Sequence, residues 1–401
     1  MNILKKIYCR LYQGVLYVGM AFMPWREPKI LGGEDSFVKA VDFMSNNGVK
    51  RPLIVCDKAA LERGALNPFF EKAQKVLDYA VYDGVLPNPT VEQVEAGLAV
   101  YKEHKCDGIL AFGGGSAMDC AKAVGARVVR PKKSVNQMKG LLKVGRKLPP
   151  FYAVPTTAGT GSECTVAAVI TDEKTHLKYH VNDFNLIPHY AILDPKLTES
   201  LPAFLTATTG MDALTHAVEA YIGKGNTRKT KRQAEQAVKL VFENLYEATA
   251  NGSNLAARDN MQKAAYLAGL AFTRAYVGYV HALAHALGGK YGLAHGYANA
   301  VLLPAVLDTY GKSAHKPLAK LARIAGLASK EDKNAVAAKK FIQAVRDLND
   351  SLSIPATFEG KINERDFDEL TRRADKEANP LYPVPKLMNA EELKQIYYKV
   401  I

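Results

Sequence analysis

The chain has 401 residues, which is enough for two domains and a large core. Hydrophobic residues make up 48% and charged residues 23%, a balance that excludes a disordered chain and is typical of a soluble globular protein. The formal net charge of +13 leaves an anionic partner open, such as nucleic acid, a membrane surface or phosphorylated ligands. The positive charges are spread out, however, and neither zinc-finger spacing nor basic strands interleaved with aromatic residues occur, so we expect no nucleic-acid partner.

Residues 1–24 form an N-terminal amphipathic extension. Lys5, Lys6 and Arg10 precede an uncharged run, residues 11–23, that is too short to span a bilayer. No small-residue cleavage site follows it, which argues against a signal peptide. We expect this segment to pack on the body of the protein, with contact to a membrane surface as the alternative. Five cysteines without a CxxC pair indicate a reducing compartment, and we expect a cytoplasmic protein.

Short apolar runs alternate with helical patterns over residues 25–195. The predicted strands are 52–56, 107–112, 151–155 and 190–194, and the predicted helices are 59–75, 91–105 and 117–129. Buried strands alternating with helices predict an α/β domain with a parallel sheet. Residues 166–171 and 178–181 could form an antiparallel ribbon beside it.

Helical patterns dominate after residue 195. They cover 204–222, 228–249, 255–288, 296–309, 314–326, 332–352, 363–376 and 390–400. The sequence therefore predicts a second, all-α domain over residues 196–401, with the boundary near residue 195.

A glycine-rich turn follows the strand 107–112. Gly113, Gly114, Gly115 and Ser116 lead directly into a helix, so free backbone N–H groups at the helix N-terminus could bind a diphosphate. The turn lacks the GxGxxG pattern and could also be only a tight turn. A second segment rich in small and hydroxyl residues, 155–163, follows the next strand, where open α/β sheets bind ligands. Asp57, after the strand 52–56, could bind a ribose 2′-hydroxyl or only cap the next helix.

One aspartate and several histidines stand at helical spacing between residues 210 and 295. Asp212 and His216 are four residues apart and share a helix face, as do His281 and His285; His295 follows a glycine-rich break at 288–292. A carboxylate and imidazoles suit a divalent transition metal. Spacing alone does not separate the role of His281 from that of His285.

Together these motifs resemble the iron-dependent (group III) alcohol dehydrogenase family. The matching pieces are GGGSAMDCAK at 113–122, PTTAGTGSE at 155–163, LDPKLTESLP at 193–202, TGMDALTHAVEAY at 209–221, and GYVHALAHALGG with HGYANAVLLP within 278–304. They occur in the family's order and spacing, and the resemblance covers residues 30–401 but not the extension at 1–24.

The resemblance implies a Rossmann-like dinucleotide-binding α/β domain and an all-α metal-binding domain, the dehydroquinate synthase-like arrangement. It implies Fe²⁺, with Zn²⁺ as the alternative ion, held by Asp212, His216, His281 and His295. His285 is implied to lie near the nicotinamide and the substrate, and it is our candidate for relaying a proton. The implied contacts to NAD(H) are Asp57, Gly113, Gly114, Gly115, Ser116, Thr156, Thr157, Thr160 and Lys178.

The reaction implied is hydride transfer between a metal-bound primary alcohol or aldehyde and the nicotinamide. A glycerol or diol dehydrogenase of the same fold is the alternative enzyme, and a basic membrane-surface or nucleic-acid-binding protein is the alternative of another class. We expect a homo-oligomer, a dimer. Two acids, Glu163 and Glu219, are expected to support the ligands or the fold. Five histidines receive no role: His104, His176, His189, His315 and, near the ribbon, His180.

Overall fold

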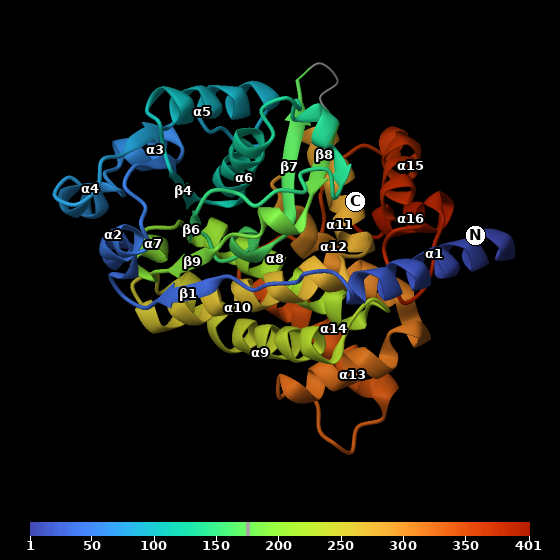
Figure 1. The fold of residues 1–401 in the computed structure, drawn as a ribbon. Coiled ribbons are helices and arrows are strands. Elements are labelled where there is room, and N and C mark those ends of the chain that lie inside the picture. The colour runs from blue at the N-terminus through green and yellow to red at the C-terminus, as the bar shows by residue number, and fades with distance from the viewer. Residues whose placement is uncertain (174–176) are drawn as a thin grey trace. The chain divides into compact units, whose positions relative to one another are not determined.

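The computed structural model describes residues 1–173 and 177–401, so His176 lies outside the described residues. The chain divides into two compact units, coloured by residue number in Figure 1. One unit comprises Pro24–Leu201, and the other comprises Met1–Met23 together with Pro202–Ile401. The N-terminal segment therefore belongs to the same unit as the C-terminal half of the chain.

The first unit is built on a parallel sheet of six strands in the order β1-β9-β6-β4-β2-β3. The strands are β1 (Lys29–Gly32), β2 (Pro52–Val55), β3 (Ala80–Tyr82), β4 (Gly108–Gly113), β6 (Phe151–Pro155) and β9 (Tyr190–Leu193). The helices of this unit are α2 (Ser36–Asn46), α3 (Lys58–Glu62), α4 (Asn67–Ala73), α5 (Val91–Glu103), α6 (Gly115–Val129) and α7 (Lys196–Glu199). This architecture confirms the predicted α/β domain, although β1 and β3 were not predicted.

Alternate residues of the central strands face opposite layers, as the pleat of a strand requires. On β4, Ile109 and Ala111 pack in one core cluster with side chains of α6, while Leu110 and Phe112 pack in a second cluster with side chains of α2 and α4. Both faces of the sheet are thus covered, which explains why its strands read as continuous apolar runs.

A smaller sheet has the order β5-β8-β7 and contains the predicted ribbon. Its strands are β5 (Gly140–Leu141), β7 (Ala167–Asp172) and β8 (Leu177–Asn182). Pairing of β7 with β8 is antiparallel, with Ala167 opposite Asn182, which confirms the ribbon.

The second unit consists of helices over its described residues, which confirms the predicted all-α class. They are α1 (Ile3–Ala21), α8 (Ala203–Ile222), α9 (Arg228–Ala250), α10 (Leu255–Ala275), α11 (Tyr279–Tyr291), α12 (His295–Tyr310), α13 (His315–Ile324), α14 (Asn334–Ser351), α15 (Phe367–Ala378) and α16 (Ala390–Tyr397). Within the described part of the chain, no helix is long and apolar enough to cross a membrane.

Two predicted helices are interrupted. The segment predicted as one helix over 59–75 is divided into α3 and α4 around Gly64. This glycine has φ 71°, which is incompatible with a right-handed helix. The helix predicted over 255–288 is wrong, because α10 ends at Ala275 and α11 begins at Tyr279. Tyr276 between them has φ 65°, a left-handed conformation that L-residues rarely adopt and that ends α10. Conversely, α11 continues through Gly288 and ends at Tyr291, later than the predicted break.

A fully buried lysine connects α6 to the loop after β6. The Lys122 ammonium donates to the Ser162 hydroxyl at 3.1 Å, to the Thr165 hydroxyl at 2.9 Å and to the Ala167 carbonyl oxygen at 2.9 Å. Burial lowers the pKa of Lys122 to about 8, although the nearby Asp119 carboxylate acts in the opposite direction. The carboxylate also accepts from Ser162 at 2.9 Å, so one buried charge network holds the loop against the helix.

We predict that Lys122→Met lowers the free energy of unfolding by about 3–5 kcal/mol, because it leaves the half-buried Asp119 carboxylate without its cation and the Ser162 and Thr165 hydroxyls without their buried donor. Urea denaturation followed by circular dichroism measures the change. The matched control is Lys132→Met, which removes an exposed lysine and should change stability by less than about 0.5 kcal/mol. Equal stability of the two variants would contradict a structural role for the network.

Candidate functional site

Four side chains that could bind a metal converge inside the helical unit. Asp212 and His216 come from α8, His281 comes from α11, and His295 is the first residue of α12. One ligand atom from each lies within 4.8 Å of all the others. Asp212, His216 and His281 are buried, and His295 is half-buried.

The carboxylate of Asp212 is the centre of this cluster. Its Oδ1 lies 3.8 Å from His216 Nδ1, 3.6 Å from His281 Nε2 and 3.4 Å from His295 Nε2. Three imidazole nitrogens and one carboxylate oxygen facing one point form a donor set that suits Fe²⁺ or Zn²⁺. The residues present therefore fit the metal expected from the sequence.

Close helix packing brings the ligands together. A Cβ at Gly296 would overlap the carbonyl oxygen of Thr208 on α8, so only glycine lets the start of α12, and with it His295, approach Asp212 so closely. The imidazole of His216 stacks on Phe272 of α10 at a ring distance of 4.0 Å and on His281 at 4.4 Å. These contacts limit the orientations that the ligand rings can adopt.

Glu219 holds His281 from behind. One carboxylate oxygen lies 2.6 Å from His281 Nδ1 and accepts from Gly278 N at 2.8 Å, and the other accepts from Val280 N at 2.8 Å. The carboxylate thus satisfies free N–H groups at the start of α11 and fixes the proton on Nδ1, which leaves Nε2 as the donor atom for a metal. The interruption between α10 and α11 exists where this carboxylate binds.

Burial and pairing act in opposite directions on these groups. Burial alone would raise the pKa of Asp212, but His216, His295 and the hydrogen bond with His281 outweigh it and hold the pKa far below its usual range. Burial would lower the pKa of His281, yet its bonds to Asp212 and Glu219 raise it to about 9. For His295, burial prevails and lowers the pKa well below its usual value. Asp212 is therefore ionised, its charge is balanced by a protonated His281, and a cation that binds at His281 Nε2 displaces a proton.

Asn299 is a site residue that the sequence analysis missed. Its Nδ2 lies 2.7 Å from Asp212 Oδ1, 3.3 Å from His281 Nε2 and 3.1 Å from His295 Nε2. An amide with two hydrogens cannot donate to all three atoms at once. At least one of these oxygen and nitrogen atoms therefore keeps a lone pair that could bind a metal ion. The position could have been noticed because Asn299 follows His295 by one helical turn.

His285 stands beside the cluster and is not a member of it. Its Nδ1 lies 2.7 Å from Glu377 Oε1, which also accepts from the Tyr382 hydroxyl at 2.8 Å. The ring stacks on that of His295 at 5.1 Å. No sequence signal pointed to Glu377, because the two residues are 92 positions apart.

The two loop segments expected to bind the cofactor lie side by side in the α/β unit. Gly113 has φ 144° and accepts from Thr156 N at 3.1 Å. Built Cβ atoms would lie 3.6 Å from Thr157 at Gly114 and 3.1 Å from Thr160 at Gly115. The glycine-rich turn thus begins α6 against the threonine-rich loop, with the helix N-terminus open to an anion.

The other expected cofactor residues lie around this turn or on the ribbon. Asp57 caps α3, accepting from Ala60 N at 2.8 Å through Oδ1, while its Oδ2 lies on the side of Gly113. Ser116 accepts from Asn88 N at 3.3 Å. Lys178 is exposed on β8, opposite Thr171. The capping role of Asp57 uses one oxygen and leaves the other available.

Glu163 and His189 lie within the packed α/β unit. Glu163 is buried, and burial raises its pKa to about 7. His189 accepts from Phe151 N at 3.1 Å through Nδ1, and burial lowers its pKa to about 4. Both belong to the packing of the α/β unit.

Two family models match the chain and together cover most of it. The model described as iron-containing alcohol dehydrogenase matches residues 27–195, and the C-terminal model of the Fe-containing alcohol dehydrogenase family matches residues 206–401. The chain belongs to the iron-containing alcohol dehydrogenase family. The resemblance inferred from the motifs is thereby confirmed.

This chain matches most of the length of several known relatives. The chain is 40% identical to 1,3-propanediol dehydrogenase of Klebsiella pneumoniae over 87% of this chain and 91% of that protein. It is 37% identical to alcohol dehydrogenase 4 of Schizosaccharomyces pombe over 92% and 86% of the two chains. Identity to NAD-dependent methanol dehydrogenase of Bacillus methanolicus is 39%, over 82% and 86%.

Solved structures share the fold. A crystal structure of 1,3-propanediol oxidoreductase matches with a TM-score of 0.91 and 37% identity, covering 95% of this chain and all (100%) of the other. Sulfoacetaldehyde reductase from Bifidobacterium kashiwanohense in complex with NAD⁺ matches with a TM-score of 0.84 and 28% identity, covering 94% and 99%.

The family and the metal-ligand cluster together define the reaction class. The protein is an oxidoreductase that interconverts alcohols and aldehydes with a nicotinamide cofactor and contains a metal-binding site. This result confirms the predicted enzyme and displaces, as its main function, the alternative of a basic membrane-surface or nucleic-acid-binding protein.

We predict that Glu219→Gln weakens metal binding by about 10–100-fold, because an amide can no longer accept from two backbone N–H groups and from His281 at once. Competition with a chromophoric chelator measures the affinity. Glu243→Gln, which changes an exposed carboxylate on α9, is the control and should bind metal normally. Unchanged affinity in Glu219→Gln would show that His281 needs no such support.

Proposed function

We propose that Asp212, His216, His281 and His295 hold the catalytic ion, and that this ion is Fe²⁺, with Zn²⁺ as the alternative. The carrying observation is the convergence of their ligand atoms within 4.8 Å around a buried carboxylate. Imidazole and carboxylate ligands bind both ions, so the family description favours iron where the donor set alone does not decide. The bound ion supplies a Lewis acid that lowers the pKa of an alcohol oxygen or polarises a carbonyl.

His285 is proposed to move the proton of the reaction. The Glu377 carboxylate, 2.7 Å from Nδ1, keeps the proton on that atom. Nε2 is then the atom that accepts a proton during alcohol oxidation and returns it during aldehyde reduction. Glu377 in turn stabilises the imidazolium that forms and fixes the ring orientation.

NAD(H) is the proposed cofactor, bound at the glycine-rich turn. We assign its diphosphate to Gly113, Gly114, Gly115 and Ser116 at the N-terminus of α6. The hydroxyl groups of Thr157 and Thr160 stand beside that turn, Thr156 contacts it through its backbone N–H, and Lys178 is assigned from the family motif. Asp57 would accept hydrogen bonds from the ribose 2′-hydroxyl through Oδ2, and its charge would repel a 2′-phosphate.

The proposed substrates are small primary alcohols and the corresponding aldehydes. A terminal diol such as 1,3-propanediol is the second candidate, because a 1,3-propanediol dehydrogenase is 40% identical over 87% of this chain. Glycerol is the further polyol to be tested. We also propose a homo-oligomeric enzyme in the cytoplasm, a compartment that suits five buried cysteines present as thiols.

Anaerobic NADH oxidation with a panel of aldehydes, together with metal analysis of the same sample, tests the proposed function. We expect turnover of short unbranched aldehydes, one equivalent of iron for each chain, and loss of activity in air that ferrous ion restores. Oxidation of glycerol in preference to 1-propanol and 1,3-propanediol would favour the polyol alternative. Full activity after metal removal would contradict the proposal.

Substitution of the two histidines of α11 separates a ligand from a proton relay. We predict that His281→Ala loses both metal and turnover. His285→Ala should retain its metal while kcat falls about 10²–10⁴-fold with a changed pH profile. Metal content by mass spectrometry and kcat measured from pH 6 to 9 distinguish the two roles. A metal-free His285→Ala, or a fully loaded and active His281→Ala, would reverse the assignment.

Asp57 is predicted to determine the preference for NADH over NADPH. Asp57→Gly and Asp57→Asn should each lower the ratio of kcat/KM for NADH to that for NADPH by about tenfold or more, since the charged acceptor is lost. Asn still caps α3, so this variant removes the charge without removing the cap. An unchanged ratio in Asp57→Asn would restrict Asp57 to its capping role.

A further inference from the structure

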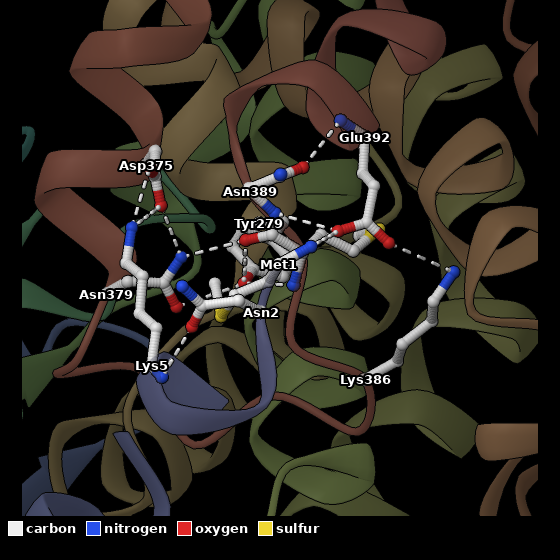
Figure 2. Close-up of polar contacts among 10 residues, drawn as sticks. Met1, Asn2, Lys5, Tyr279, Asp375, Asn379, Lys386, Asn389 and Glu392 are labelled. Carbon is white, nitrogen blue, oxygen red and sulfur yellow. Dashed lines mark hydrogen bonds and ion pairs between the residues drawn. The ribbon is translucent and has the colours of Figure 1, made fainter. Parts of the chain in front are cut away.

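The N-terminal helix α1 is fixed to the helical unit along one side. Cys9 and Gln13 are buried on this side. Ion pairs and hydrogen bonds connect it to the C-terminal residues of the same unit: the Met1 amine with Glu392 at 3.0 Å, Lys5 with Asp375 at 3.1 Å, and Gln13 with the carbonyl oxygens of Pro380 at 2.8 Å and Tyr382 at 2.9 Å. Figure 2 shows the contacts of Met1 and Lys5. Because these contacts fix the rotation of α1 about its axis, the opposite face of α1 points away from the helical unit.

That opposite face is an apolar stripe. It consists of six large side chains with the following exposed fractions: Leu4 74%, Tyr8 57%, Leu11 66%, Val15 73%, Val18 59% and Phe22 81%. With roughly 150–200 Å² of surface for each large side chain, these fractions leave on the order of 700 Å² of apolar surface uncovered. A single patch on a monomer is commonly about 300–600 Å², and a stable interface needs about 800 Å² from each partner. The stripe, with Ile3 and Ile7 at its edge, has the size of a protein interface.

The spacing of the stripe is that of a paired helix. Its members follow one another at intervals of four, three, four, three and four residues, a period of 3.5. Gly14 and Gly19 flank the stripe, and a Cβ added to either would meet nothing within 4 Å. A glycine in a helix costs about 1 kcal/mol relative to alanine, and no neighbour in this chain requires one at either position. Small residues beside an apolar stripe do let a second helix approach closely.

Charge on α1 favours a second copy of the chain over an anionic surface. The helix carries three basic residues, all in its N-terminal half, and none lies on the stripe. Two of them are engaged within the chain, Lys5 with Asp375 and Arg10 with Gln13 and the Pro385 carbonyl oxygen. Only Lys6 is left for lipid headgroups, whereas interfacial helices present several cations. Antiparallel pairing would place each basic half beside the uncharged half of the other copy.

We propose that the stripe of α1 is a self-association surface on which α1 of a second copy packs antiparallel about a two-fold axis near Leu11 and Val15. Such an isologous contact buries the stripe of both copies at once. Leu11 then faces Val15 of the second copy, and Leu4 faces Phe22 of the second copy. The surface is separate from the metal cluster, so the proposal does not depend on the proposed reaction.

Site-directed cross-linking of the full-length protein tests this geometry. The five native cysteines are buried, so a cysteine introduced on the stripe reacts selectively with a short bis-maleimide. We expect Val15→Cys to give a covalent dimer in high yield. Leu4→Cys should give little, because antiparallel pairing separates the two copies of residue 4 by most of the helix length. Tyr246→Cys, exposed on α9, is the control for random collision. Equal yields for Val15→Cys and Tyr246→Cys, or for Val15→Cys and Leu4→Cys, would overturn the proposal.

Sedimentation equilibrium of Leu11→Glu measures the contribution of the stripe. Because Leu11 is exposed in the single chain, the variant should keep its far-ultraviolet circular dichroism and its rate of NADH oxidation. We expect the dissociation constant of the pairing to rise on the order of a hundredfold, since two apolar contacts are lost in each pair. The mean mass should halve at concentrations where the unchanged chain is fully paired. Equal masses at every dilution would overturn the proposal, as would binding to phosphatidylserine vesicles that Leu11→Glu abolishes without a change in mass.

Discussion

The helical unit is organised around one carboxylate in a place from which water is excluded. Asp212 is 2% exposed, and moving an ionised carboxylate from water to such a site costs several kcal/mol unless positive or hydrogen-bonding groups surround it. The fold meets this requirement with three imidazoles from three helices. Their nitrogens approach within 3.4–3.8 Å of the same oxygen, Asp212 Oδ1. A buried carboxylate surrounded by imidazoles needs positive charge beside it, which either a proton on His281 or a bound cation can supply.

Several otherwise unrelated features of the fold follow from that arrangement. Gly296 allows α12 to begin against α8. The interruption before α11 leaves backbone N–H groups that donate hydrogen bonds to Glu219. The same carboxylate contacts Nδ1 of His281, so that Nε2 faces Asp212. On the next turn of α11, His285 is directed by Glu377. These two neighbouring histidines thus have different carboxylate partners, Glu219 for His281 and Glu377 for His285.

The anchoring of α1 involves the segment that supplies Glu377. Lys5 pairs with Asp375, which precedes Glu377 in the chain. Gln13 donates to the carbonyl oxygens of Pro380 and Tyr382, which follow it. The N-terminal helix is therefore part of the structure that supports His285, even though it lies outside the motifs shared with the family. Its outward face serves no such purpose within the chain.

Sequence patterns predicted the strands and helices that have a clear apolar run or a clear helical periodicity. Apolar runs identified β2, β4, β6 and β9, whereas β1, which is mostly exposed, and β3, which has three residues, were missed. Helical periodicity cannot reveal the interruption at Tyr276, because the helical pattern continues through 255–288 although the backbone has φ 65° at this residue. Identical spacing likewise could not distinguish His281 from His285. Asn299 and Glu377 take part only because the chain folds back on itself.

X-ray absorption at the metal edge of the loaded enzyme tests the central claim most directly. The claim is that one aspartate and three histidines bind the ion. It predicts a shell of nitrogen and oxygen ligands at about 2.0–2.2 Å, with the outer-shell scattering of three imidazole rings. Loss of one imidazole contribution is expected in His216→Ala wherever that variant still binds metal. A sulfur ligand at about 2.3 Å, or a spectrum without imidazole scattering, would contradict the account.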